Sequence, residues 1–191
     1  MSIRNVEIKA RSTRNDEIRN VLNELGADFR GEDHQVDTYF HVSGGRLKLR
    51  EGRIENNLIH YQRNDQGGPK ESRITLFACE PAGRDEASST RSLKKILTDA
   101  VGVRVVVDKE REIYFLDNVK FHIDSVAGLG KFVEIEAIDT DGSIGSEELR
   151  RQCERYVALF GIAEDDLVAE SYSDMLVRLQ GGSQTARREE G

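Results

Sequence analysis

The sequence predicts an α+β fold in which eight mostly antiparallel strands close into a barrel and helices pack outside it. Three observations support this prediction. Charged and apolar residues alternate in most candidate strands, as in residues 5–11, where Val, Ile and Ala alternate with Glu, Lys and Arg. Turn signals rich in Gly and Asn separate the strands. Three amphipathic helices need apolar surface to cover, and the Val, Ile and Leu faces of the strands provide it.

The strands are predicted from this alternation and from the turns that bound them. Segments 35–42 and 46–51 form a hairpin around Gly44 and Gly45, because glycine accepts the positive φ that a tight turn requires. Asp117-Asn118 marks a further turn, and so does the Gly-Leu-Gly sequence at 128–130. The eight predicted strands are 4–11, 35–42, 46–51, 58–63, 72–79, 103–115, 119–126 and 131–138.

The helices are predicted from apolar residues at i, i+3, i+4 and i+7 spacing. In the first helix this stripe begins at Ile18 and ends at Leu25, and Gly26 is a typical C-terminal stop. The predicted helices are 15–25, 89–101, 145–160 and 171–179.

Length and composition limit the class of protein. A chain of 191 residues fits one domain, which we expect to comprise residues 1–180, with 181–191 as a disordered tail. The net charge of −7 argues against general nucleic-acid binding, so an anion site must be local. No signal peptide or membrane helix is evident, so we expect a cytoplasmic protein without a membrane partner. Cys79 and Cys153 lack metal-ligand spacing and are expected to be reduced packing residues.

The alternation also places charges of both signs inside the predicted barrel, where low-dielectric walls concentrate counter-ions. The eight predicted cations exceed the four carboxylates by four charges, which matches the roughly −4 of a triphosphate near neutral pH. Carboxylates are ligands for the Mg²⁺ or Mn²⁺ that accompanies such a group. Internal salt bridges and a solvated strand face are the simpler alternatives. The cations are Lys9, Arg11, Lys48, Arg50, Arg63, Arg73, Lys109 and Arg111, and the carboxylates are Glu7, Asp124, Glu134 and Glu136.

A set of motifs in a fixed order resembles the CYTH superfamily, which contains class IV adenylyl cyclases and thiamine or inorganic triphosphatases. The resemblance runs from about residue 4 to residue 176, and it implies the fold of that family, a triphosphate tunnel. The segments 128–130 and 171–174 resemble the cyclase-like branch more than the triphosphatases. The motifs that carry the resemblance lie at 6–11, 37–40, 46–50, 68–70, 124–130 and 132–136.

The resemblance implies further roles for single residues. Where the family hydrolyses triphosphates, a Lys of the first strand and a Tyr of the second act together as a base, which points to Lys9 and Tyr39 as catalytic residues. Packing is the alternative for Tyr39. Lys70, in a Gly-Gly-Pro-Lys loop, is either a mobile cation at the tunnel mouth that joins the triphosphate-binding set, or a surface lysine.

Two positions depart from the family's pattern. The opening signature E-x-E-x-K begins here with Asn5, so an amide replaces one acidic metal ligand, and binding of a second metal should weaken. The fifth strand of the family often reads R-x-E-x-E, whereas Arg73 is followed at those spacings by Thr75 and Phe77. Both departures reduce the expected support for a metal and for catalysis.

Three functions fit these residues. In the leading hypothesis, a metal-dependent adenylyl cyclase, the ribose 3′-OH of ATP attacks the α-phosphorus and pyrophosphate leaves. In the second, a triphosphatase directs water to the terminal phosphorus of inorganic triphosphate, thiamine triphosphate or a nucleotide. In the third, the chain binds a triphosphate or polyphosphate without turning it over. In each case the partner is a triphosphate compound, and we expect a monomer or homodimer.

Overall fold

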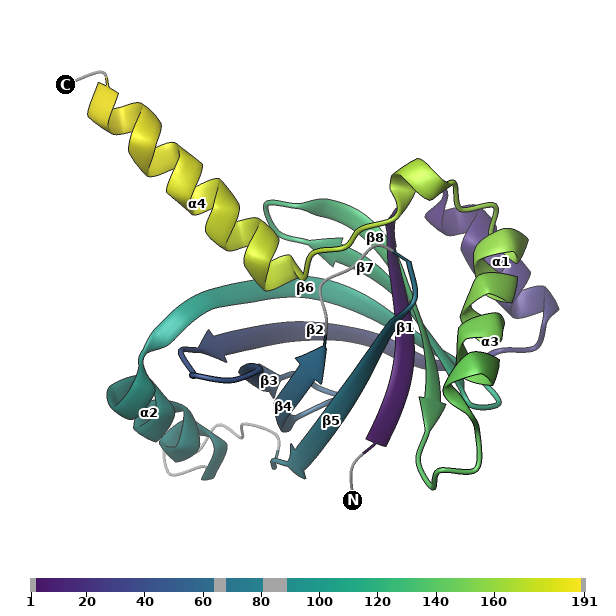
Figure 1. Cartoon of the computed structure of the whole chain (residues 1–191), viewed down its shortest axis with the longest axis horizontal. Coiled ribbons are helices and arrows are strands. Elements are labelled where there is room, and N and C mark those ends of the chain that lie inside the picture. Colours follow the sequence, from purple (N-terminus) through teal and green to yellow (C-terminus); the bar gives the residue numbers. More distant parts are fainter. Residues whose placement is uncertain (1–2, 64–67, 81–88, 190–191) are drawn as a thin grey trace.

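The computed structural model describes residues 3–63, 68–80 and 89–189. Within them, eight strands pair antiparallel in the order β1-β5-β4-β3-β2-β6-β7-β8, and β8 pairs with β1 to close the ring (Figure 1). The predicted closed antiparallel sheet is therefore confirmed. The strands are β1 (Ile3–Arg11), β2 (Asp28–Phe40), β3 (Arg46–Glu51), β4 (Asn57–Arg63), β5 (Lys70–Ala78), β6 (Val103–Leu116), β7 (Val119–Val126) and β8 (Gly130–Asp139).

The helices lie outside the ring, as predicted. In Figure 1, α1 and α3 lie together on one side of the barrel against β1 and β8, whereas α4 projects away from the body. Within the described ranges, no helix combines the length and apolar character needed to cross a membrane. The helices are α1 (Asn15–Glu24), α2 (Ser89–Val101), α3 (Ser146–Leu159), the short 3-10 helix η1 (Glu164–Asp166) and α4 (Tyr172–Glu189).

The main hydrophobic core fills the space between α1, α3 and the outer face of the sheet. Val6 and Ile8 of β1 are buried there with Leu149 of α3. Each such side chain contributes about 1.5–3 kcal/mol by leaving water. Because side chains alternate along a strand, burial of Val6 and Ile8 outside the ring turns Glu7 and Lys9 toward its inside. Burial of the apolar residues of the strand thus directs its charged residues into the ring.

The predicted hairpin between β2 and β3 forms around Gly45, which has a φ of 68°. A Cβ at this position would lie 2.6 Å from the carbonyl oxygen of Tyr61, so the turn accepts only glycine. Asp117 also has a positive φ, 53°, at the predicted turn between β6 and β7. Both turns were recognisable because a short polar or glycine pair separates two alternating segments.

Two elements are longer than predicted. Strand β2 begins at Asp28 instead of residue 35, because β6 has 14 residues and provides backbone partners along this length, with a register shift between Phe29 and Gly31. The polar composition of 28–34 hid this pairing. Helix α4 extends past residue 179 to Glu189, into the segment that composition assigned to a disordered tail.

Candidate active site

The ring encloses a cavity of about 200 Å³, far larger than the about 10–15 Å³ that one water molecule needs. Along each strand, side chains that line the cavity alternate with side chains that face outward. The charged faces of several strands therefore meet in one space. Eight of the twelve charged residues predicted to face the inside of the barrel line this cavity: Glu7, Lys9, Lys48, Arg50, Lys109, Arg111, Glu134 and Glu136.

Three of the cations converge on one carboxylate that the sequence prediction missed. Asp37 of β2 accepts hydrogen bonds from Lys48 Nζ at 2.9 Å, from Arg50 Nε at 2.8 Å and Nη2 at 3.0 Å, and from Lys109 Nζ at 2.8 Å. Burial alone would raise the pKa of Asp37, but these cations hold it well below its usual range. Burial, together with Arg50 and Arg111, lowers the pKa of Lys109 to about 7 in spite of Asp37.

A second internal carboxylate enters the cavity from the loop between β3 and β4. Glu55 pairs with Lys120 and accepts from Arg50 Nη1 at 2.7 Å. The loop is held in place by Asp33 of β2, whose carboxylate accepts three hydrogen bonds of 2.6–3.1 Å from the backbone N–H groups of residues 53–55. A loop residue shows no strand periodicity, so no sequence pattern indicated Glu55.

Among the residues that the structure describes, six cationic and five carboxylate side chains line the cavity, a net charge of +1. The predicted surplus of four positive charges is therefore wrong. It omitted Asp37 and Glu55, which neutralise much of the basic cluster, and it omitted Lys120. It included Arg11, Arg73 and Asp124, which do not line the cavity, and Arg63, whose side chain lies outside the described part of the chain. Internal carboxylates explain how so many cations can lie together without a bound anion.

The inward face of β5 differs from the prediction by one residue. Ser72, Ile74 and Leu76 line the cavity, so Arg73 and Thr75 point to the outside, where both are exposed. The prediction assumed that the polar residues of every strand face inward. In β5 Ile74 and Leu76 face inward instead, and the positions that were searched for carboxylates, Thr75 and Phe77, are exposed on the outer face.

Two other predicted phosphate ligands also lie elsewhere. Arg11, at the end of β1, is exposed and donates to the carbonyl oxygen of Leu129 at 3.2 Å. Lys70 is fully buried and its Nζ donates to the carbonyl oxygen of Val168 at 2.7 Å, so it is not a mobile cation at the tunnel mouth. The side chain of Arg63 lies outside the described part of the chain.

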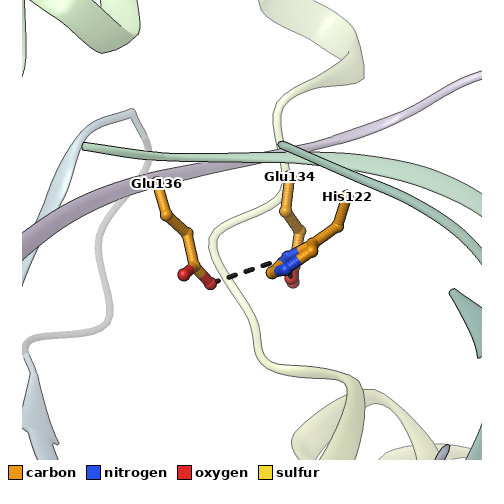
Figure 2. Close-up of side chains that lie close together, drawn as sticks. All are labelled: His122, Glu134 and Glu136. Carbon is orange, nitrogen blue, oxygen red and sulfur yellow. Dashed lines mark hydrogen bonds and ion pairs between the residues drawn. The ribbon is translucent and has the colours of Figure 1, made fainter. Parts of the chain in front are cut away.

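Two of the predicted acidic ligands, Glu134 and Glu136, lie on β8 and face the cavity (Figure 2). Glu134 lies 3.1 Å from Lys9 Nζ and 2.6 Å from Arg111 Nη2, and these cations, against the effect of burial, hold its pKa well below the usual range. His122 of β7, which the prediction missed, points at the same carboxylate, with Nδ1 3.3 Å from Oε2. Glu136 lies opposite Glu7 in the pairing of β1 with β8. Three carboxylates therefore face one part of the cavity.

Asp124 has a different place from the one predicted. Its two oxygens accept from Arg111 Nε at 2.7 Å, Arg111 Nη2 at 2.5 Å and the Tyr172 hydroxyl at 2.8 Å, and it does not line the cavity. Asp124 thus orients Arg111 in this structure, and its role as a metal ligand stays a prediction. Burial, and then Asp124, raise the pKa of Tyr172 well above its usual value, so its hydroxyl remains a donor.

Lys9 and Tyr39 both line the cavity, but they contact different residues. Lys9 Nζ lies 3.8 Å from the ring centre of Tyr172, whereas the ring of Tyr39 lies 5.5 Å from Lys48 Nζ. The phenol beside Lys9 is thus Tyr172, at the start of α4. The sequence offered two signals for missed residues: Asp37 has the strand parity of Tyr39, and His122 has that of Asp124.

One part of the cavity wall is apolar. It is formed by aliphatic and aromatic side chains of β4, β5 and β8, which are Ile59, Tyr61, Ile74, Leu76 and Ile138. Asn5 and Ser72 lie opposite each other in the pairing of β1 with β5, next to this wall. Their Oδ1 and Oγ atoms are buried and accept no hydrogen bond from the part of the chain that is described. Asn5 therefore faces the cavity and not the outside.

Similar proteins share this fold over nearly their whole length. A protein from Methanocaldococcus jannaschii named "Putative adenylate cyclase" is 28% identical over 181 residues, covering 89% of this chain and 97% of that protein. A solved protein from Pyrococcus horikoshii superposes with a TM-score of 0.70 at 24% identity, covering 89% of this chain and 98% of the other.

Two further structures have names that mention an activity. One, from Vibrio parahaemolyticus, is named a "putative adenylate cyclase" and has a TM-score of 0.67 at 23% identity, covering 90% and 97% of the two chains. The other, from Hippeastrum, is described as an adenylyl cyclase candidate with dominant triphosphatase activity, and has a TM-score of 0.56 at 14% identity, covering 95% and 96%. At these identities the likeness shows the fold alone. The CYTH domain family matches residues 4–172, which include every strand of the ring, and the chain therefore belongs to the CYTH family.

Proposed function

We propose that this protein is a metal-dependent enzyme that converts a nucleoside triphosphate, ATP in the leading case, into a 3′,5′-cyclic nucleotide and pyrophosphate. The observation that carries the proposal is the division of one cavity into a basic region and an apolar region. A nucleoside triphosphate has the matching two parts, a polyanion and a largely apolar base. Inorganic triphosphate has only the first part and gives the apolar wall nothing to contact.

The basic region supports binding of the phosphate chain. Lys48, Arg50 and Lys109 all donate to the carboxylate of Asp37 within 2.8–3.0 Å. A phosphate oxygen can take the place of a carboxylate oxygen in such a cluster, because both are acceptors that suit ammonium and guanidinium donors. Arg111, fixed by two hydrogen bonds to Asp124, supplies a further rigid donor.

The apolar region supports binding of the nucleoside. Ile59, Ile74 and Leu76 form a surface against which a base can pack, since every nucleobase has an apolar π-face. Asn5 Oδ1 and Ser72 Oγ lie next to this surface and have no partner among the described residues. Ribose hydroxyl groups are donors that would satisfy both atoms and remove the cost of about 1–3 kcal/mol for each unpaired buried group.

The carboxylates fit a divalent cation. Glu7 and Glu136 lie opposite each other on neighbouring strands and line the cavity with Glu134, and such hard oxygen donors suit Mg²⁺ or Mn²⁺. A divalent ion held there would supply Lewis acidity toward a phosphoryl oxygen and toward the attacking hydroxyl. Asn5 stands where the family's signature has its first Glu, so this group of ligands is less acidic than that signature.

In the proposed reaction the ribose O3′ forms a bond to the α-phosphorus, the bond from that phosphorus to the bridging oxygen breaks, and pyrophosphate leaves with the hydroxyl proton. The cations of the basic region hold the leaving pyrophosphate, where negative charge develops. The apolar wall holds the base and so fixes the ribose over the α-phosphate, which lowers the entropy cost of ring closure.

A triphosphatase is the second candidate, and the activity in the name of the Hippeastrum protein of the same fold favours it. In this case the ligand is shifted along the basic region so that water attacks the terminal phosphorus. Lys9 and Tyr39 then remain the predicted catalytic residues. This candidate shares the cavity with the cyclase, so only the products separate the two reactions.

The test is a product analysis of the full chain with ATP, GTP, thiamine triphosphate and tripolyphosphate, each with Mg²⁺ and with Mn²⁺. The proposal predicts cyclic nucleotide and pyrophosphate in equal amounts, and loss of both in Glu136→Gln. Glu110→Gln, at an exposed position on β6, is the matched control. Inorganic phosphate without cyclic nucleotide would replace the cyclase by the triphosphatase, and binding without turnover would support a non-catalytic module.

A further inference from the structure

His122 of β7 is a buried imidazole that points at two of the cavity's carboxylates. In Figure 2 its ring lies at the carboxylate end of Glu134, and a dashed line joins it to the carboxylate of Glu136. Its Nδ1 lies 3.3 Å from Glu134 Oε2 and 3.8 Å from Glu136 Oε1. The backbone enforces this arrangement, because His122 and Glu134 are paired residues of β7 and β8 and therefore share one face of the sheet.

These separations suit three ligands of one metal ion. Two atoms that each bind an ion at about 2.1 Å lie about 3–4 Å apart. The two measured distances fall in this range, and one ligand atom from each of the three side chains lies within 4.8 Å of the others. Small rotations of the flexible Glu136 side chain suffice to bring its carboxylate to an ion held by the other two ligands. The arrangement therefore needs no movement of the strands.

The second nitrogen of His122 argues against a role in packing alone. Its Nε2 is buried and finds no hydrogen-bond partner anywhere in the described ranges, and the residue as a whole is 1% exposed. A buried polar atom without a partner costs about 1–3 kcal/mol. An apolar side chain would pack here without this cost, so packing alone does not explain the imidazole, and Nδ1 is the nitrogen that faces the carboxylates.

We propose that His122 is a nitrogen ligand, with Glu134 and Glu136, of the divalent ion in this cavity, and that the site consequently prefers Mn²⁺ to Mg²⁺. Mg²⁺ favours oxygen ligands and keeps its water shell, whereas first-row transition ions accept imidazole. The inference rests on the proposed metal dependence, although its test requires no turnover.

The charges around the three ligands are close to balance. Lys9 and Arg111 contact Glu134, and Lys120 lies level with Glu136 in the pairing of β7 with β8. Glu7 faces the same space from β1. Hydrogen bonds to a ligating carboxylate are usual and orient it, so the contacts of Lys9 and Arg111 are compatible with coordination. Because these cations also repel an ion, binding should be tighter when an anionic ligand neutralises them.

The experiment is electron spin-echo spectroscopy of Mn²⁺ bound to the full chain, with the ion alone and with added tripolyphosphate. Nitrogen from a coordinated imidazole gives a ¹⁴N modulation that carboxylates and water do not give. His122→Asn places an amide oxygen near the position of Nδ1 and should abolish this modulation. It should also lower the ratio of Mn²⁺ to Mg²⁺ affinity about tenfold or more, because an oxygen ligand replaces the nitrogen.

His34→Asn, at an exposed histidine that pairs with Asp108 on the outer face, is the matched control and should change neither readout. Absence of ¹⁴N modulation in the wild-type protein under both conditions would overturn the proposal, whether or not the protein turns over ATP. An unchanged metal preference in His122→Asn would also overturn it. If the cyclase assay fails but the nitrogen signal is clear, the proposed metal site is still supported and only the proposed reaction is excluded.

Discussion

Replacing Asp37 by Asn tests whether an internal carboxylate holds the basic cluster together before a ligand binds. The carboxylate accepts from Lys48, Arg50 and Lys109 within 2.8–3.0 Å, and it is 2% exposed. Removing one partner of a buried ion pair costs about 3–5 kcal/mol, because the remaining charge stays buried. Asn keeps an acceptor oxygen worth about 1 kcal/mol. We therefore expect a loss of about 3 kcal/mol in the free energy of unfolding.

The same change should strengthen anion binding. Without Asp37 the three cations lack their internal counter-charge, so the cavity gains one unit of positive charge and tripolyphosphate has no competitor for these donors. We expect its Kd to fall about tenfold, which adds about 1.4 kcal/mol of binding free energy. Saturating ligand should then recover much of the lost stability, since ligand at 100 times Kd contributes about 2.7 kcal/mol.

The assays are urea denaturation and calorimetric titration with tripolyphosphate in the absence of metal. Asp108→Asn is the control, because the side chain of Asp108 lies on the outer face of β6, where it forms an exposed pair with His34. The stability difference should also shrink on acidification. The folded-state pKa of Asp37 lies below its unfolded value of about 4, so its contribution is present above that pH and is lost as the pH falls through the folded-state pKa. A variant as stable as wild type, or one that binds tripolyphosphate no tighter, would refute the reasoning.

Three further predictions concern single residues of the cavity. Glu136→Gln should abolish metal-dependent turnover and cost less stability than Glu134→Gln, since only Glu134 pairs with both Lys9 and Arg111; activity and urea curves of both variants check this. Asn5→Glu should lower the Mg²⁺ concentration for half-maximal activity about tenfold by adding a carboxylate at the cavity wall, and an unchanged titration would remove Asn5 from the metal site. Lys109 has a pKa of about 7 in the free protein, so the Kd for tripolyphosphate should rise by up to about tenfold per unit above pH 7; Lys109→Arg should be flatter over that range, and equal slopes would contradict the assignment.

The ring and most of its inward-facing charges could be predicted because, in β1 and β8, burial of the apolar residues on one face of the strand directs the charged residues to the other face. Val6 and Ile8 must leave water, so Glu7 and Lys9 must face the other way. The same rule failed in β5. There the alternation is as strict, but Ile74 faces the cavity, because part of the cavity wall is itself apolar. Periodicity separates the two faces of a strand without saying which face lies inside.

The charge balance could not be predicted for a related reason. Counting strand residues identified the cations, whereas the carboxylates that neutralise them come from a missed strand position and from a loop. Asp37 has the correct parity in β2, so a search for acidic residues on the inward face would have found it. Glu55 is directed inward only because Asp33 binds the backbone of its loop, which is a tertiary contact without a sequence signature.

These internal carboxylates affect which ligands the cavity can select. Because the cations are already paired, an incoming anion gains only the difference between its own contacts and those of Asp37 and Glu55. One inorganic phosphate replaces few of these contacts and should gain little. A triphosphate chain carries charge over several groups and can contact Arg50, Lys109 and Arg111 at once, while its bound metal ion satisfies the carboxylates that remain. Exchange of internal for external ion pairs thus favours a long polyanion with a divalent ion over a short one, without requiring an unstable empty state.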